Sequence, residues 1–82
     1  IIEHLKFTDN FVLVEVKAPK IFWNNTLIKL DVRNKYNINI VGIKKDKGEF
    51  LSNPTANVVI EQGDILVIIT DKKTVESFNK LI

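Results

Sequence analysis

Cysteine and methionine are absent from this chain of 82 residues, and histidine, tryptophan and tyrosine each occur once. Without cysteine the fold can have neither a disulfide nor a cysteine-ligated zinc site, and the single His4 cannot build a histidine metal cluster. A domain of this size buries only about 60–65% of the surface of its unfolded chain. Its stability therefore depends on a good hydrophobic core, a partner subunit or a ligand.

An excess of one charge is also lacking. The 12 basic and 10 acidic residues leave a net charge of +2, which is too small and too mixed to favour nucleic-acid binding. The densest basic run, Lys44, Lys45 and Lys47, is interrupted by Asp46 and is typical of a solvated turn. No apolar run approaches the roughly 20 residues of a membrane helix. Because the first residue is not methionine, we expect a single domain, residues 1–82, cut from a longer chain.

Hydrophobic residues make up 45% of the chain, and their spacing predicts an α+β domain. Residues 11–17 alternate as a strand whose Val12, Val14 and Val16 form a wholly apolar face toward the core. The run ILVIIT at 65–70 is typical of a strand buried on both faces. Shorter strands are expected at 38–43, 49–51 and 58–60, with a lead-in at 4–7.

Two helices are expected among these strands. The first begins at an N-cap among Asn24, Asn25 and Thr26. The second follows Thr70 or Asp71, with an apolar stripe of Val75, Phe78 and Leu81 or Ile82. The predicted order is β-α-β-β-β-α in a small mixed sheet, with one possible extra strand at the front.

Two positions constrain the backbone. Gly42, inside the strand expected at 38–43, indicates a bulge or a close backbone neighbour. Pro54 favours extended geometry at Asn53.

The titratable groups are scattered and predict no enzyme. His4 has no nucleophile or acid partner nearby in sequence, and the carboxylates fall at caps and turns. No Walker loop or GxGxxG pattern occurs. Trp23 and Tyr36 lack the basic groove that base stacking needs, which favours packing in a core or an interface.

Arg33 stands out as the only arginine in a chain otherwise served by lysine. It is predicted near the end of the first helix. Arginine is the better planar, bidentate partner for phosphate or carboxylate. The structural alternative is an exposed salt bridge to Asp31 or Glu49.

Three segments together resemble the RCK C-terminal domain, also called TrkA-C, the smaller lobe of the regulators of potassium conductance. They are FVLVEVKAP with the block WNNTLIKLDVRNKYNINIVGIKK, then FLSNPTANVVIEQGD, then GDILVIIT with TVESFNKLI. The most specific part is "NP", a few residues, then "GD" before an apolar strand. Asn25 and Asn37 stand where the family often has glycine, and asparagine tolerates the left-handed conformation expected there.

The resemblance implies a regulatory domain of Ktr- and Trk-type potassium systems. Such a domain is cytoplasmic, peripheral to the inner face of the membrane, and pairs as a homodimer. Through the full-length regulatory ring it acts on a membrane-embedded transporter subunit. It implies no cofactor, metal or nucleic-acid partner.

The Gram-positive Ktr-like group is the most similar, because an arginine after the helix is followed by an Asn-Ile pair, at Arg33, Asn39 and Ile40. In that group the dimer cleft binds cyclic di-AMP, which inactivates potassium uptake. A two-fold dimer offers each feature of this two-fold ligand twice, so each Arg33 is expected to meet one phosphate and Asn39 to bond phosphate or adenine. The apolar floor under each adenine is expected from Leu27, Ile38, Ile40 and Pro54. The alternative is a dimerisation module of a cation transporter or antiporter with another ligand or none.

Overall fold

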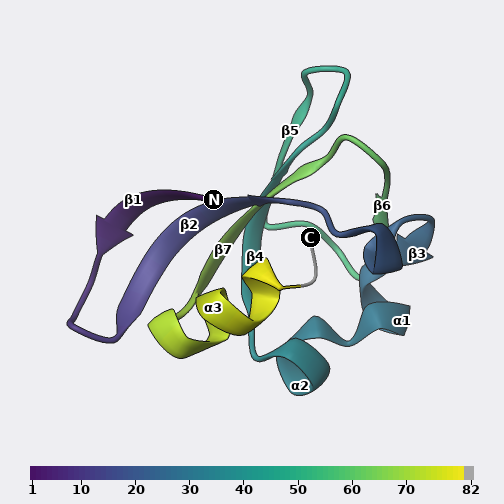
Figure 1. Cartoon of the computed structure of the whole chain (residues 1–82). Coiled ribbons are helices and arrows are strands. Elements are labelled where there is room, and N and C mark those ends of the chain that lie inside the picture. The colour runs from purple at the N-terminus through teal and green to yellow at the C-terminus, as the bar shows by residue number, and fades with distance from the viewer. Residues whose placement is uncertain (81–82) are drawn as a thin grey trace.

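The structure, a computed structural model, describes residues 1–80 (Figure 1). Its elements in chain order are β1 (Ile2–Lys6), β2 (Phe11–Lys17), the 3-10 turn η1 (Lys20–Phe22), β3 (Asn25–Thr26), α1 (Leu27–Leu30), α2 (Val32–Tyr36), β4 (Asn39–Lys44), β5 (Phe50–Ser52), β6 (Val59–Ile60), β7 (Ile65–Asp71) and α3 (Lys72–Asn79). The α+β class predicted from the sequence is confirmed, and the possible extra strand at the front exists as β1.

The strands form a five-stranded sheet in the order β1-β2-β7-β4-β5 and a two-stranded sheet of β3 and β6. Every pairing is antiparallel, so the expectation of a mixed sheet is wrong. The reason lies in the connections: β1–β2 and β4–β5 turn directly back as hairpins, and β7 runs antiparallel to both of its neighbours, β2 and β4.

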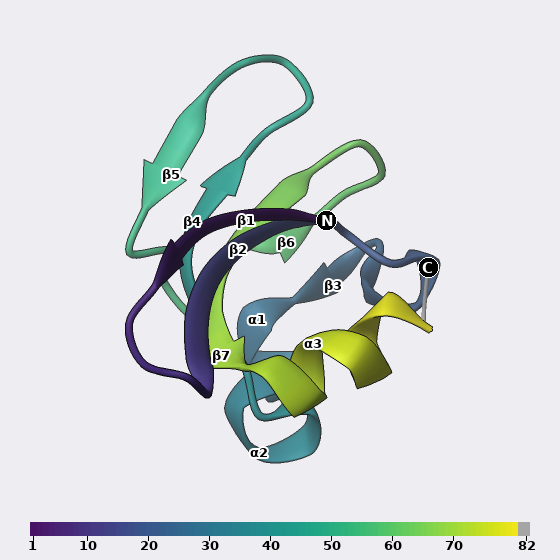
Figure 2. The ribbon, with the colours of Figure 1, turned by 60° about the vertical axis from the view of Figure 1, so that its left-hand side comes forward.

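The core lies between the sheet and the helices. The sheet curls around α3, with α2 on the same side (Figure 2). Val12, Val14 and Val16 are 1–2% exposed, as their alternation predicts. Phe22 packs edge-to-face against Tyr36 and Phe78, with ring centroids 4.9 and 5.6 Å apart.

The opposite face of the sheet is less covered. Along β7, Leu66 and Ile68 are fully buried, whereas Val67 and Ile69 are only half-buried. The expectation that this strand is buried on both faces is therefore wrong for residues 1–80, because their helices lie on the other side of the sheet. We call the surface formed by Leu5, Phe11, Leu13, Val67 and Ile69 the outward face, since their pairings place them together.

The predicted first helix is divided into α1 and α2 at Asp31, which has a left-handed backbone (φ 47°, ψ 51°). Of the three candidate N-caps, Thr26 takes the role, and its hydroxyl accepts from the Lys29 amide at 3.3 Å. The second helix begins after Asp71, whose carboxylate accepts from the Thr74 amide at 2.7 Å. The predicted stripe residues Val75 and Phe78 pack on the core; Leu81 and Ile82 lie outside the described residues.

Positive φ angles fall partly where the sequence predicts them. Asn37 has φ 56°, as expected, but Asn25 lies in β3 and its neighbour Asn24 is left-handed instead (φ 65°). Asn53 has φ 47°, so it is not extended before Pro54; its amide donates to the Val41 carbonyl at 2.9 Å. The expected bulge in β4 is confirmed by a register shift between Ile40 and Gly42.

Lys45 does not lie in a solvated turn. Its ammonium is 2.5 Å from the Asp64 carboxylate, which is 1% exposed, and 3.0 Å from Glu61. Burial lowers the pKa of Lys45, but the hydrogen bonds to Asp64 and Glu61 outweigh burial and the net pKa lies above its ordinary value. This ion pair joins the β4–β5 hairpin to the turn before β7.

Candidate functional site

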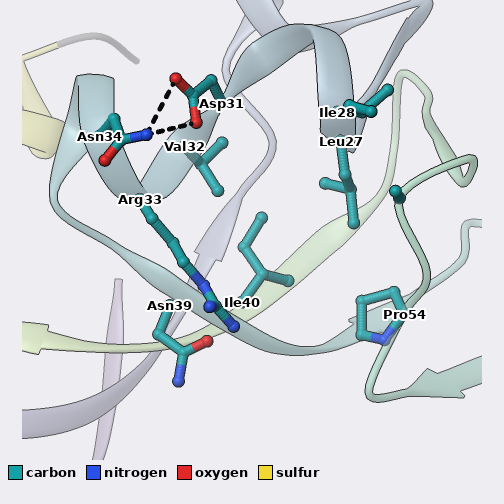
Figure 3. Close-up of a pocket in the computed structure, with 10 residues that line it drawn as sticks. Leu27, Ile28, Asp31, Val32, Arg33, Asn34, Asn39, Ile40 and Pro54 are labelled. Atoms are coloured by element: carbon teal, nitrogen blue, oxygen red, sulfur yellow. Dashed lines mark hydrogen bonds between the residues drawn. The ribbon is translucent and has the colours of Figure 1, made fainter.

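A cavity of about 380 Å³ opens where α1, α2, the start of β4 and the loop after β5 meet (Figure 3). This volume lies within the range of roughly 300–1,000 Å³ that is usual for small-molecule sites. The residues that line it are Leu27, Ile28, Asp31, Val32, Arg33, Asn34, Asn39, Ile40, Pro54 and Ala56.

Five of the six residues predicted for a ligand site line this cavity: Leu27, Arg33, Asn39, Ile40 and Pro54. The sixth, Ile38, does not line it, because it is 2% exposed and belongs to the hydrophobic core. Ile40, two residues further along the chain, is half-exposed at the cavity wall. Three-dimensional packing therefore gives Ile38 and Ile40 different burial, which the sequence pattern alone does not distinguish.

Arg33 presents a free positive charge to the cavity. It is exposed on α2 and forms no ion pair with any of residues 1–80, so the alternative of a salt bridge to Asp31 or Glu49 does not hold. The Asp31 carboxylate instead accepts from the Asn34 side-chain amide at 3.0 and 3.2 Å. The Arg33 side chain runs toward Asn39 and Ile40, so a charged group and an amide lie together at one wall (Figure 3).

The opposite wall is apolar and is held by backbone hydrogen bonds. The Leu27 amide donates to the Val58 carbonyl and the Ile28 amide to the Ala56 carbonyl, both at 3.0 Å. These bonds join the first turn of α1 to the loop that carries Pro54. The cavity therefore combines donors for an anion on one side with an apolar surface on the other.

The sequence did not single out the remaining lining residues, Ile28, Asp31, Val32, Asn34 and Ala56. Ile28 adjoins Leu27 along the chain, Val32 and Asn34 adjoin Arg33, and Asp31 lies two positions before Arg33. Their contribution depends on the break between α1 and α2, which has no glycine or proline to signal it.

Arg33 and Asn39 also border a smaller hollow of about 280 Å³, which is lined by Phe11 and Ile69 and also by Asn37, Ile38 and Thr70. Phe11 and Ile69 belong to the outward face. The cavity and the hollow therefore share the two polar residues Arg33 and Asn39.

A second polar cluster lies at the centre of the sheet. The buried Glu15 carboxylate is 2.8 Å from the Lys44 ammonium and also contacts His4, so His4 has an acid partner that its sequence neighbourhood does not reveal. The hydrogen bond from Lys44, then that from His4, holds the pKa of Glu15 below its ordinary value.

Two further findings concern residues 1–80 as a whole. No group of three or more histidine, aspartate or glutamate side chains is placed to hold a metal ion. None of the helices in this part of the chain is both long and apolar enough to cross a membrane.

Fold and cavity together define a small α+β domain with a curled antiparallel sheet, one partly uncovered sheet face and an adjoining open cavity. The chain belongs to the TrkA-C domain family, whose model matches residues 11–82. The resemblance drawn from the sequence is thereby confirmed.

Relatives in Bacillus subtilis (strain 168) support this assignment. The chain is 40% identical over 80 residues to Ktr system potassium uptake protein C, covering 98% of this chain and 36% of that protein. It is 30% identical over 78 residues to Ktr system potassium uptake protein A, covering 95% of this chain and 35% of that protein. The chain thus spans about a third of the length of these relatives.

Among solved structures, the chain is similar to the RCK C domain of the potassium transport protein KtrA in complex with cyclic di-AMP. The TM-score is 0.75 at 40% identity, covering 85% of this chain and 81% of that one. The RCK_C domain dimer of S. agalactiae BusR with cyclic di-AMP has a TM-score of 0.75 at 22% identity, which shows a common fold.

Proposed function

We propose that the cavity binds cyclic di-AMP at a two-fold interface between two copies of the domain, and that binding lowers potassium uptake by a membrane-embedded transporter subunit. The domain acts as part of a longer regulatory chain on the cytoplasmic side of the membrane. The support from relatives is the KtrA RCK C domain, 40% identical, which was solved with this ligand. A regulatory role without catalysis accords with the TrkA-C family.

The observation that carries the proposal is that Arg33 and an apolar wall line the same cavity. An arginine with no carboxylate partner in residues 1–80 is available to a phosphate, which it can bind through charge-assisted hydrogen bonds. Asn39, beside it, adds an amide donor and acceptor. Leu27, Ile40 and Pro54 supply the surface that an adenine ring needs.

The outward face supports a two-fold arrangement. Leu5 and Phe11 are each 50% exposed, and apolar surfaces of this kind often mark interaction sites. Since the hollow beside Phe11 shares Arg33 and Asn39 with the cavity, a second copy on this face would approach the ligand site. Two copies would then offer two arginines to the two phosphates.

Regulation follows from linkage. A ligand held by both copies favours the relative arrangement that suits it, by as much as its affinities for the two arrangements differ. That rearrangement would be passed through the longer chain to the transporter.

Titration calorimetry with cyclic di-AMP tests the proposal. We expect one ligand per two chains, and a loss of affinity of about tenfold or more in Arg33→Ala, because hydrogen bonds to charged groups contribute about 1.5–3 kcal/mol. Lys35→Ala is the matched control: it removes a positive charge from the same helix but outside the cavity, and should bind like the unaltered chain.

Unchanged affinity in Arg33→Ala would overturn the site. If the unaltered chain does not bind cyclic di-AMP but sediments as a dimer, the dimerisation module with another ligand or none is the better description.

A further inference from the structure

Asn37 lies between the two polar residues of the cavity, four positions after Arg33 and two before Asn39. It ends α2 in the left-handed conformation, and its backbone N–H donates to the Val32 carbonyl. The position of its backbone therefore determines how both neighbouring segments enter the site.

The side chain of Asn37 connects this point to a distant part of the fold. Its amide nitrogen donates to the Asp71 carboxylate at 3.0 Å and to the Thr74 hydroxyl at 3.1 Å. Its backbone carbonyl accepts from the Thr70 hydroxyl at 2.7 Å. Thr70, Asp71 and Thr74 form the junction between β7 and α3, and Asp71 also caps α3.

A glycine would adopt the φ of 56° with less strain, because it has no Cβ. It would also lack the amide that reaches Asp71 and Thr74. Asparagine at position 37 therefore has more backbone strain than glycine would have. In exchange, its side chain adds two tertiary hydrogen bonds at a position where the local fold does not need a side chain.

We infer that Asn37 is a positioning residue: its hydrogen bonds to the β7–α3 junction hold residues 33–39 in place, so that Arg33 and Asn39 are arranged before the ligand arrives. This inference rests on the proposed function. Its physical basis is that side chains and loops which must become ordered on binding reduce affinity, whereas preorganised ones do not.

The test compares Asn37→Gly with Asn24→Gly. Both variants replace a left-handed asparagine with glycine, and neither residue lines the cavity, but of the two only Asn37 hydrogen-bonds to the β7–α3 junction. Two properties are measured for each variant: backbone 15N order parameters without ligand, and affinity for cyclic di-AMP by calorimetry below the unfolding transition.

For Asn37→Gly we expect order parameters over residues 33–39 to fall from about 0.85 toward about 0.6, and the dissociation constant to rise about fivefold or more. Asn24→Gly should change neither. A second variant, Thr74→Ala, removes one of the two acceptors and should give a smaller change in the same direction.

The outcomes separate this inference from the proposed function. Unchanged order over residues 33–39 in Asn37→Gly overturns the inference, whether or not the ligand binds. Reduced order with unchanged affinity also overturns it, because the contacts would then be structural only. If the unaltered chain binds no cyclic di-AMP, the proposed function fails, and the order parameters alone decide whether Asn37 holds this segment.

Discussion

The ring of Phe50 lies across the backbone of Gly42, so close that a Cβ atom on Gly42 would be 2.5 Å from the ring's ζ carbon. Gly42 follows the bulge in β4, and its neighbour on β5 is Ser52. The glycine is needed here for space, since its φ is not positive. Phe50 is half-exposed and covers β4 at this point, and any residue larger than glycine at position 42 would push its ring away.

Gly42→Ala should therefore destabilise the domain by about 1 kcal/mol, near the lower limit for overpacking, because the exposed Phe50 ring can swing aside. Urea unfolding of Gly42→Ala, Phe50→Ala and the double variant forms a thermodynamic cycle. We expect the double variant to be less destabilised than the sum of the single variants. Additive effects would show that the ring and the added methyl do not meet.

The ion pair of Lys45 and Asp64 should contribute to stability as a unit. Lys45→Met leaves a carboxylate that is 1% exposed without its cation, and we expect a loss of about 3 kcal/mol in urea unfolding. Lys47→Met, in the same hairpin, is the control and should stay within about 0.5 kcal/mol. Adding Asp64→Asn to Lys45→Met should recover part of the loss; a further full loss would contradict this account.

Much of the fold could be predicted from short-range patterns. The alternation of Val12, Val14 and Val16 gave the correct core face, and Thr26 and Asp71 were among the expected caps. The break at Asp31 was not predicted, because aspartate in a left-handed conformation has no distinctive sequence signal. The extent of burial of β7 was also not predicted, since an apolar run does not show on how many sides its neighbours pack.

The cavity could be predicted only in part from local features. The lack of other arginines drew attention to Arg33, and the family resemblance led to Asn39 and the apolar wall. Ile38 was included in that wall together with Ile40, and only three-dimensional packing places it in the core. Contacts such as His4 with Glu15 join different strands and have no local signature.

Ile38 and Leu27 should therefore respond differently to truncation. Ile38→Ala removes a buried side chain and should cost about 2–5 kcal/mol of stability. Leu27→Ala, at the half-buried cavity wall, should cost less stability but weaken cyclic di-AMP binding several-fold. Urea unfolding and calorimetry on both variants check this. A greater loss of affinity in folded Ile38→Ala than in Leu27→Ala would contradict the assignment of Ile38 to the core.

Glu15 should make the stability of the domain sensitive to acid. Its pKa in the folded state is lowered, chiefly by the hydrogen bond from Lys44 and then by that from His4, from an ordinary value of 4.5. A carboxyl group with a lowered pKa contributes stability above its unfolded pKa and loses it as pH falls through the folded value. We expect the free energy of unfolding to decrease as the pH is lowered past about 4.5, and to decrease less steeply in Glu15→Gln.

Glu76→Gln, on the exposed side of α3, is the control and should keep the steep dependence. Asp71, whose pKa is lowered chiefly by the Thr74 amide, accounts for acid sensitivity that remains in Glu15→Gln. Identical pH profiles for Glu15→Gln and the unaltered chain would show that the contacts with Lys44 and His4 do not stabilise the carboxylate.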